Sequence, residues 1–216
     1  MQLYMSSYRL GKDISTLEKW KKEHGNDIIV IPNAVDVFPD GDRKISGIDD
    51  KCNDLREIGF NTTILDLRNY FGKQKELFKY LIDKNAFYVI GGNVFTLRQA
   101  MKLSGFDDYL LSKIDDDDIL YSGFSAGICV LANNLKGLDL VDQTDFDPYD
   151  YGNIIMEGVG VIDYLPVPHY QSNHPESEAM NEVVKYLETN NLSYKTLRDG
   201  EVIIENSSKK QETKKL

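Results

Sequence analysis

Hydrophobic and polar positions alternate along the chain in blocks that predict strands and helices in turn. Near-continuous apolar runs at 27–32, 86–90 and 119–121 predict strands buried on both faces, as in a parallel sheet. A helical period of apolar positions, clearest at 74–83, predicts amphipathic helices between the strands. This alternation is typical of an α/β fold with a mostly parallel central sheet and helices on both faces.

The remaining elements follow from local signals. A capping box at Ser15–Glu18 predicts a helix that ends near Gly25. The Asp199-Gly200 pair predicts a turn that joins two closing strands into a hairpin. The other expected elements are strands at 3–5 and 62–67, helices at 50–58, 95–103, 106–114 and 176–189, loops at 35–44 and 133–153, and hairpin strands at 194–197 and 201–204. We expect one domain over 1–205 and a charged, disordered tail over 206–216.

Composition narrows the class of protein. The 216 residues carry a net charge of −10, which argues against a nucleic-acid surface. No apolar stretch is long enough for a membrane span, and the first residues lack the layout of a signal peptide. Two cysteines do not make a disulfide framework, and three histidines leave little for a structural zinc site. We therefore expect a cytoplasmic protein without metal or cofactor, and interpret the acidic run 115–118 as a solvated loop.

The stretch 119–131 contains the strongest chemical signal. A short apolar strand runs into Gly123-Phe124-Ser125-Ala126-Gly127 and then into a second apolar run that predicts a helix. A strand that turns sharply into a helix through G-x-S-x-G is a nucleophile elbow. This pattern predicts Ser125 as a nucleophile and the backbone N–H of Ala126 as a donor to an oxyanion.

A second motif is expected at the same edge of the sheet. Gly91-Gly92-Asn93 directly follows the strand at 86–90, just as Ser125 follows the strand at 119–121. Ligands bind at the carboxyl ends of strands in open α/β sheets. The two motifs are therefore expected to lie together.

A serine nucleophile needs a base, and a third group that orients the base. Among the three histidines, His24 is expected at a helix end and His174 in a polar loop. His169 follows two prolines at a strand end and is the preferred base. Asp139 and Asp142 both flank apolar residues and are both candidates for the acid; the residues alone do not choose between them.

Three motifs in this order give the chain its resemblance to the peptidase E family. They are Gly91-Gly92-Asn93-Val94-Phe95-Thr96-Leu97, Gly123-Phe124-Ser125-Ala126-Gly127 and Val167-Pro168-His169-Tyr170. Members of this family are serine peptidases on a fold similar to the class I glutamine amidotransferase domain, which is flavodoxin-like. The resemblance covers the chain from about Tyr88 to Tyr170, and the strand pattern extends it further.

The resemblance implies roles for particular residues. Ser125 would be the nucleophile and His169 the base, with oxyanion donors at Ala126 and Gly92 and substrate contacts at Asn93. The acid in the family follows the serine by a little over a dozen residues, which implies Asp139, with Asp142 in reserve. A short peptide would be the substrate, with no metal or organic cofactor, and a homodimer would be in keeping with the fold.

Two departures from the family pattern affect the expected specificity. Phe124 replaces the family's tryptophan, and the segment 171–178 lacks the arginine that follows the histidine in the family. Peptidase E enzymes cleave dipeptides with an N-terminal aspartate, whose carboxylate needs a cation; here it would have to come from elsewhere, such as Arg98 or Lys102. The alternatives are a cyanophycinase-like isopeptide hydrolase and a non-catalytic amidotransferase-like binding domain.

Overall fold

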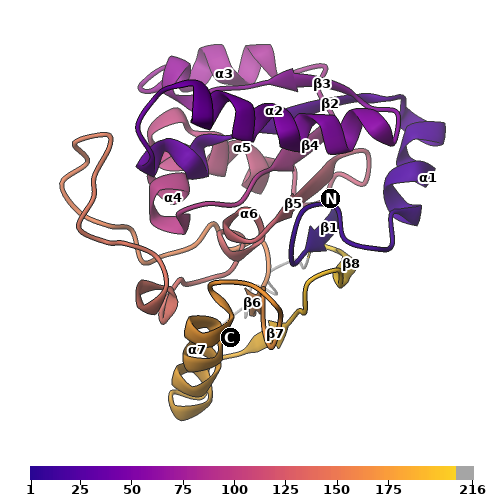
Figure 1. Cartoon of the computed structure of the whole chain (residues 1–216). Helices are drawn as coiled ribbons and strands as arrows, with labels where there is room; N and C mark the ends of the chain where they lie inside the picture. The colour runs from indigo at the N-terminus through magenta and orange to yellow at the C-terminus, as the bar shows by residue number, and fades with distance from the viewer. Residues whose placement is uncertain (208–216) are drawn as a thin grey trace, which may run out of the picture.

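A six-stranded sheet runs through the centre of the protein (Figure 1), for which a computed structural model describes residues 1–207. Its strands are β1 (Gln2–Ser6), β2 (Asp27–Ile31), β3 (Asn61–Ile64), β4 (Ala86–Val89), β5 (Leu120–Phe124) and β8 (Val202–Asn206). They lie in the order β3-β2-β4-β5-β1-β8, with β1 to β5 parallel and β8 antiparallel to β1. The expected mostly parallel α/β sheet is confirmed.

Helices cover both faces of this sheet, because successive strand residues point to opposite sides. On one face, α1 (Ser15–His24) and α2 (Asp42–Glu57) pack through residues such as Trp20 and Leu55. On the other, α3 (Gln74–Tyr80), α4 (Val94–Ser104) and α5 (Phe106–Ser112) pack through residues such as Leu77 and Met101. In β4, Phe87 and Val89 join the second core while Tyr88 joins the first.

A smaller unit follows the main sheet along the chain. Strands β6 (Leu165–Val167) and β7 (Tyr194–Thr196) form a parallel pair, connected by α7 (Ser177–Thr189), and lie below β1 in Figure 1. Three 3-10 turns, η1 (Asn33–Val37), η2 (Leu67–Tyr70) and η3 (Leu138–Leu140), and the short helix α6 (Ala126–Cys129) complete the described elements. Residues 141–153 form the long loop at the left of Figure 1.

Three expectations about local structure are wrong. The strands at 194–197 and 201–204 do not form a hairpin, since β7 pairs with β6 and β8 pairs with β1. Helix α2 begins at Asp42, within the expected loop, after Gly41 in an extended conformation. Asn206, expected in the tail, closes β8 against Gln2, and the rest of the expected tail from 208 lies outside the described residues.

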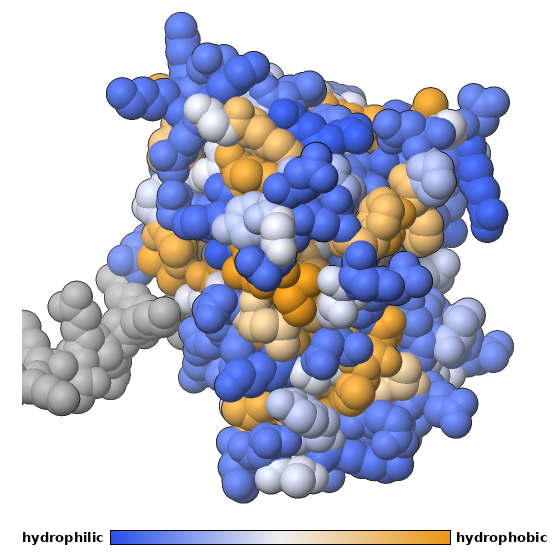
Figure 2. Space-filling model, turned by 90° about the vertical axis from the view of Figure 1, so that its left-hand side faces the viewer, coloured by the Kyte–Doolittle hydropathy of each residue, from blue (hydrophilic) through white to orange (hydrophobic). Residues whose placement is uncertain are grey.

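Figure 2 views the molecule from the side of α4 and the 141–153 loop. Apolar side chains gather in a band across the middle of this otherwise hydrophilic face. Within residues 1–207, every helix is too short or too polar to cross a bilayer.

Candidate active site

Ser125 occupies a strained turn between β5 and α6. Its φ of 50° and ψ of −123° lie outside the regions that residues with a side chain usually adopt. The neighbouring glycines make the turn possible, because a Cβ would lie 2.6 Å from the Val89 carbonyl oxygen at Gly123 and 2.2 Å from it at Gly127. Strand β4 thus passes so close to the elbow that only glycine fits on either side of Ser125.

The Gly91–Gly92 turn packs directly against this elbow. A Cβ on Gly91 would lie 2.9 Å from Cβ of Ser125. Gly92 has a φ of 147°, and a Cβ there would lie 2.4 Å from the carbonyl oxygen of Ala34. Within residues 1–207, the backbone N–H groups of Gly92 and Ala126 donate no hydrogen bond. Both residues expected to hold an oxyanion therefore offer free donors beside the elbow, and that role stays a prediction.

His169 lies two residues beyond the end of β6 and is 1% exposed. Its backbone has a φ of 58°, and its N–H donates to Ser7 Oγ at 2.8 Å. Its Nδ1 lies 2.7 Å from Oδ1 of Asp199, and Ser7 Oγ donates to the same carboxylate oxygen at 2.8 Å. Ser7, just past the end of β1, therefore holds both the backbone of His169 and its carboxylate partner.

The acid that contacts His169 is Asp199, which the sequence analysis assigned to a hairpin turn. Asp139 is exposed and accepts a hydrogen bond from the Gly137 N–H at 3.1 Å. Asp142 accepts one from the Val94 N–H at 2.7 Å, at the start of α4. Neither contacts His169; the carboxylate that does is Asp199, and the catalytic role of each of these acids stays a prediction. Because β6 and β7 are parallel, the residues after their carboxyl ends, His169 and Asp199, meet; a hairpin would have kept them apart.

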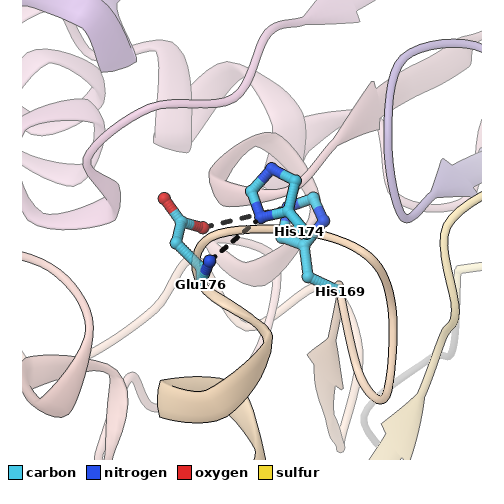
Figure 3. Close-up of side chains that lie close together, drawn as sticks. All are labelled: His169, His174 and Glu176. Atoms are coloured by element: carbon cyan, nitrogen blue, oxygen red, sulfur yellow. Dashed lines mark hydrogen bonds and ion pairs between the residues drawn. The ribbon is translucent and has the colours of Figure 1, made fainter.

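The other side of the imidazole faces the segment that leads into α7, which ends at the N-cap residue Glu176. Nε2 of His169 lies 3.9 Å from Oε2 of Glu176, and the His174 ring stacks on the His169 ring at 3.7 Å between centroids (Figure 3). Burial lowers the pKa of His169, an effect that His174 reinforces and that Asp199 and Glu176 oppose. Among the described residues, Ser125 Oγ makes no hydrogen bond, so the serine and the imidazole are not yet linked.

Asn93 has a structural position in this arrangement. Its Oδ1 accepts from the Thr96 N–H at 2.9 Å and so caps α4. Its Nδ2 donates to the carbonyl of Gln143 at 2.8 Å. The second bond ties the Gly-Gly-Asn turn to the loop that carries Asp142, while substrate contact by Asn93 stays a prediction.

Comparisons with known proteins agree with these motifs. The family model described as Peptidase family S51 matches residues 7–212. The uncharacterized peptidase Lmo0363 of Listeria monocytogenes is 34% identical over 106 residues, and Lin0382 of Listeria innocua is 32% identical over 106 residues. Each of these matches spans about half of both chains, 47% of this chain in either case and 47% or 46% of the relative.

Two solved structures share the fold. A candidate peptidase E from Listeria monocytogenes EGD-e superposes with a TM-score of 0.70 at 22% identity, covering 96% of this chain and 98% of its own. A peptidase from an acI-B1 actinobacterium gives a TM-score of 0.63 at 15% identity, covering 96% and 84%.

Asp142 predicts a pH-dependent stability. Burial raises its pKa to about 7, so the folded protein holds a proton there that the unfolded chain has released. The free energy of unfolding should therefore fall as the pH rises from about 4 to about 7, by roughly 1.4 kcal/mol per pH unit. Asp142→Asn keeps the acceptor for the Val94 N–H and removes the charge.

We expect Asp142→Asn to raise the melting temperature at pH 8 and to change it far less at pH 5. Thermal unfolding of wild type and variant across this range measures the effect. Asp139→Asn is the matched control, because Asp139 is exposed and lies three residues before Asp142. An equal shift at both pH values would contradict the assignment of the raised pKa to Asp142.

Proposed function

Because the chain belongs to peptidase family S51, we propose that it is a serine peptidase that hydrolyses short peptides through an acyl-enzyme on Ser125. The observation that carries the proposal is the hydrogen bond between Asp199 and Nδ1 of His169. A carboxylate on one imidazole nitrogen fixes the tautomer and leaves the other nitrogen as a base. A buried imidazole held this way, in a chain that also has a strained serine elbow, is more than a scaffold requires.

The proposed reaction has two halves, formation of the acyl-enzyme and its hydrolysis, and His169 acts as a base and then as an acid in each. Ser125 Oγ attacks the peptide carbonyl while Nε2 of His169 takes its proton, and Asp199 stabilises the imidazolium. The carbonyl oxygen, now negative, accepts hydrogen bonds from the N–H groups of Ala126 and Gly92. The imidazolium then protonates the leaving amine. Water hydrolyses the acyl-enzyme by the same steps, with His169 again as base.

The contact between Ser125 and His169 must form for this chemistry. In the free protein, Nε2 of His169 faces the Glu176 carboxylate rather than an Oγ atom. Catalytic hydrogen bonds in free enzymes are often long and tighten when substrate binds. We place the closing of this contact in the substrate complex.

A pocket beside the elbow suits a substrate of dipeptide size. It has a volume of about 600 Å³ and is lined by Gly91 and Phe124, the neighbours of the oxyanion glycine and of Ser125, and by the 38–44 segment. Pockets for small ligands typically measure about 300–1,000 Å³. This volume favours a short peptide over the cyanophycin-like polymer, for which an open groove would be the better fit.

Arg43 is the cation in this pocket that is free to bind a substrate carboxylate. Lys44 pairs with Asp36 at 2.6 Å and Lys51 with Asp50 at 2.9 Å. Arg43, by contrast, forms no ion pair or hydrogen bond with residues 1–207. Arg98 is unsuitable, since it is buried and its guanidinium lies 3.0 Å from Asp107; Lys102 shares that carboxylate at 3.7 Å. We propose that Arg43 replaces the arginine missing after His169.

The triad is tested by its acid. Asp199→Asn should lower kcat by roughly 10³–10⁴-fold, because the amide no longer holds the required tautomer. Asp139→Asn, the matched control, should leave kcat within about twofold. A library of dipeptides that includes Asp-X and Glu-X, read by release of free amines, supplies the measurement, with Ser125→Ala as the inactive reference. If Asp139→Asn abolished activity and Asp199→Asn did not, Asp139 and not Asp199 would be the acid of the triad.

The lowered pKa of His169 predicts the acid side of the pH profile. The imidazole must be neutral to act as base, so kcat/KM should fall only below pH 6.5, the ordinary pKa of histidine. His174→Gln should move the acid side of the profile to higher pH, because His174 lowers the pKa of His169. Glu176→Gln should move it to lower pH, because Glu176 raises that pKa. The rate of labelling by a fluorophosphonate, measured against pH, reports the same ionisation without a known substrate. Opposite shifts would refute the assignment to His169, and absence of labelling would favour a non-catalytic domain.

The role of Arg43 predicts a change in specificity. Arg43→Gln should lower kcat/KM for Asp-X dipeptides by roughly tenfold to a hundredfold, because hydrogen bonds to charged groups contribute about 1.5–3 kcal/mol. Dipeptides with a neutral first residue should lose much less. Arg56→Gln, on the same helix and outside the pocket, is the control. A uniform loss over all dipeptides would mean that Arg43 does not read the carboxylate.

A further inference from the structure

Two histidines and a glutamate come together at the start of α7. His169, His174 and Glu176 each offer one ligand atom, and these atoms lie within 4.8 Å of one another. The proposed reaction uses only His169. Figure 3 shows the two rings stacked and the Glu176 carboxylate turned toward them.

The donors are those of a transition metal rather than of calcium or magnesium. Two imidazole nitrogens with one carboxylate oxygen suit Zn²⁺, whereas hard cations prefer oxygen ligands. Three protein ligands of this kind leave a fourth position for water.

The partner on the far side of His169 strengthens the case. A histidine that binds a metal usually donates its other N–H to a carboxylate or a carbonyl, which orients the ring and raises its basicity. Asp199 makes this contact with Nδ1, so the lone pair of Nε2 is the one left for the cluster. The arrangement that prepares His169 as a base therefore also prepares it as a ligand.

Coordination of one ion requires the His174 ring to turn out of the stack, because the two rings lie within 8° of parallel and the in-plane lone pairs of parallel rings do not converge. Ligand atoms around tetrahedral zinc lie about 3.3 Å apart for bonds of about 2.0 Å, somewhat closer than here. His169 is buried and fixed, while His174 and Glu176 are partly exposed. A hydrogen bond of 3.2 Å from the Glu176 N–H to Nδ1 of His174 holds these two residues together in the metal-free protein, and it would be released if Nδ1 became the ligand.

We propose that His169, His174 and Glu176 form a reversible zinc site that switches the protein off. A zinc ion on Nε2 occupies the lone pair that would accept the proton of Ser125. The binding claim stands on the donor cluster alone; the inhibition claim rests on the proposed function.

Direct titration tests the binding claim. Metal-free protein is titrated with ZnCl₂ in a calorimeter and, separately, against a zinc-sensitive dye. We expect one zinc per chain and no heat with MgCl₂. His174→Phe keeps an aromatic ring over His169 and removes a ligand, and should weaken zinc binding by roughly tenfold or more. Asp199→Asn should weaken it by about 10–100-fold through the lost second contact.

Controls separate this site from other causes. His24→Gln removes a histidine that stacks on Trp20 outside the cluster, and should bind zinc as wild type does. Glu176→Gln is a second ligand variant should His174→Phe fail to fold, and circular dichroism checks both. Unchanged zinc affinity in folded His174→Phe or Glu176→Gln, or no zinc binding by wild type, would overturn the proposal.

The inhibition claim has its own readout. Zinc should block labelling of wild type by a fluorophosphonate, and EDTA should restore the labelling. His174→Phe should need at least roughly tenfold more zinc for the same degree of block. If the protein bound zinc as expected but neither reacted with the fluorophosphonate nor hydrolysed any dipeptide, the metal site would stand and the peptidase proposal would be rejected. Labelling that persists with zinc bound would reject the switch alone.

Discussion

The close approach of Val89 to the elbow is the constraint on which the rest of the site depends. The carbonyl of this last β4 residue leaves no room for a Cβ at Gly123 or Gly127. It therefore presses the chain after β5 into the turn that gives Ser125 its unusual backbone, a conformation that costs of order 1–3 kcal/mol. The same strand continues into Gly91, which packs on Ser125 itself. One strand end thus positions the serine and the turn beside it.

A second junction positions His169. His169 and Asp199 belong to the small β6–β7 unit, whereas Ser125 belongs to the main sheet. Ser7 links the two, because it extends from β1, which is hydrogen-bonded to β5, and its hydroxyl contacts both His169 and Asp199. Tyr8 adds ring contacts to Phe124 and His169, both at 6.0 Å between centroids. Ser7 and Tyr8 therefore connect His169 and Asp199 to the part of the main sheet that carries Ser125.

The sequence predicted the features that depend on local pattern and missed the one that depends on topology. The buried strands and the glycine-flanked turn at Ser125 are each predicted by a short run of consecutive residues, and the structure confirms both. Asp199 was missed because Asp-Gly between two short strands is a strong local signal for a hairpin. The local signal was overruled by long-range pairing: β8 completes the edge of the main sheet beside β1, and β7 joins β6. The wrong hairpin is therefore also the reason that the contact between Asp199 and His169 was not predicted.

Glu176 places a second carboxylate near the imidazole of His169, on the side opposite Asp199. A carboxylate near Nε2 stabilises the imidazolium, and so raises the pKa that burial and His174 lower. It also attracts any cation that approaches the same nitrogen, whether a proton or a metal ion, and it raises the pKa of Asp142 beyond the effect of burial. In the proposed reaction, the free amino group of a short peptide would be a further cation for this carboxylate. Glu176, the N-cap residue of α7, is therefore the group at which the two proposals meet, because it faces the Nε2 atom that the proton of Ser125 and the zinc ion would both need.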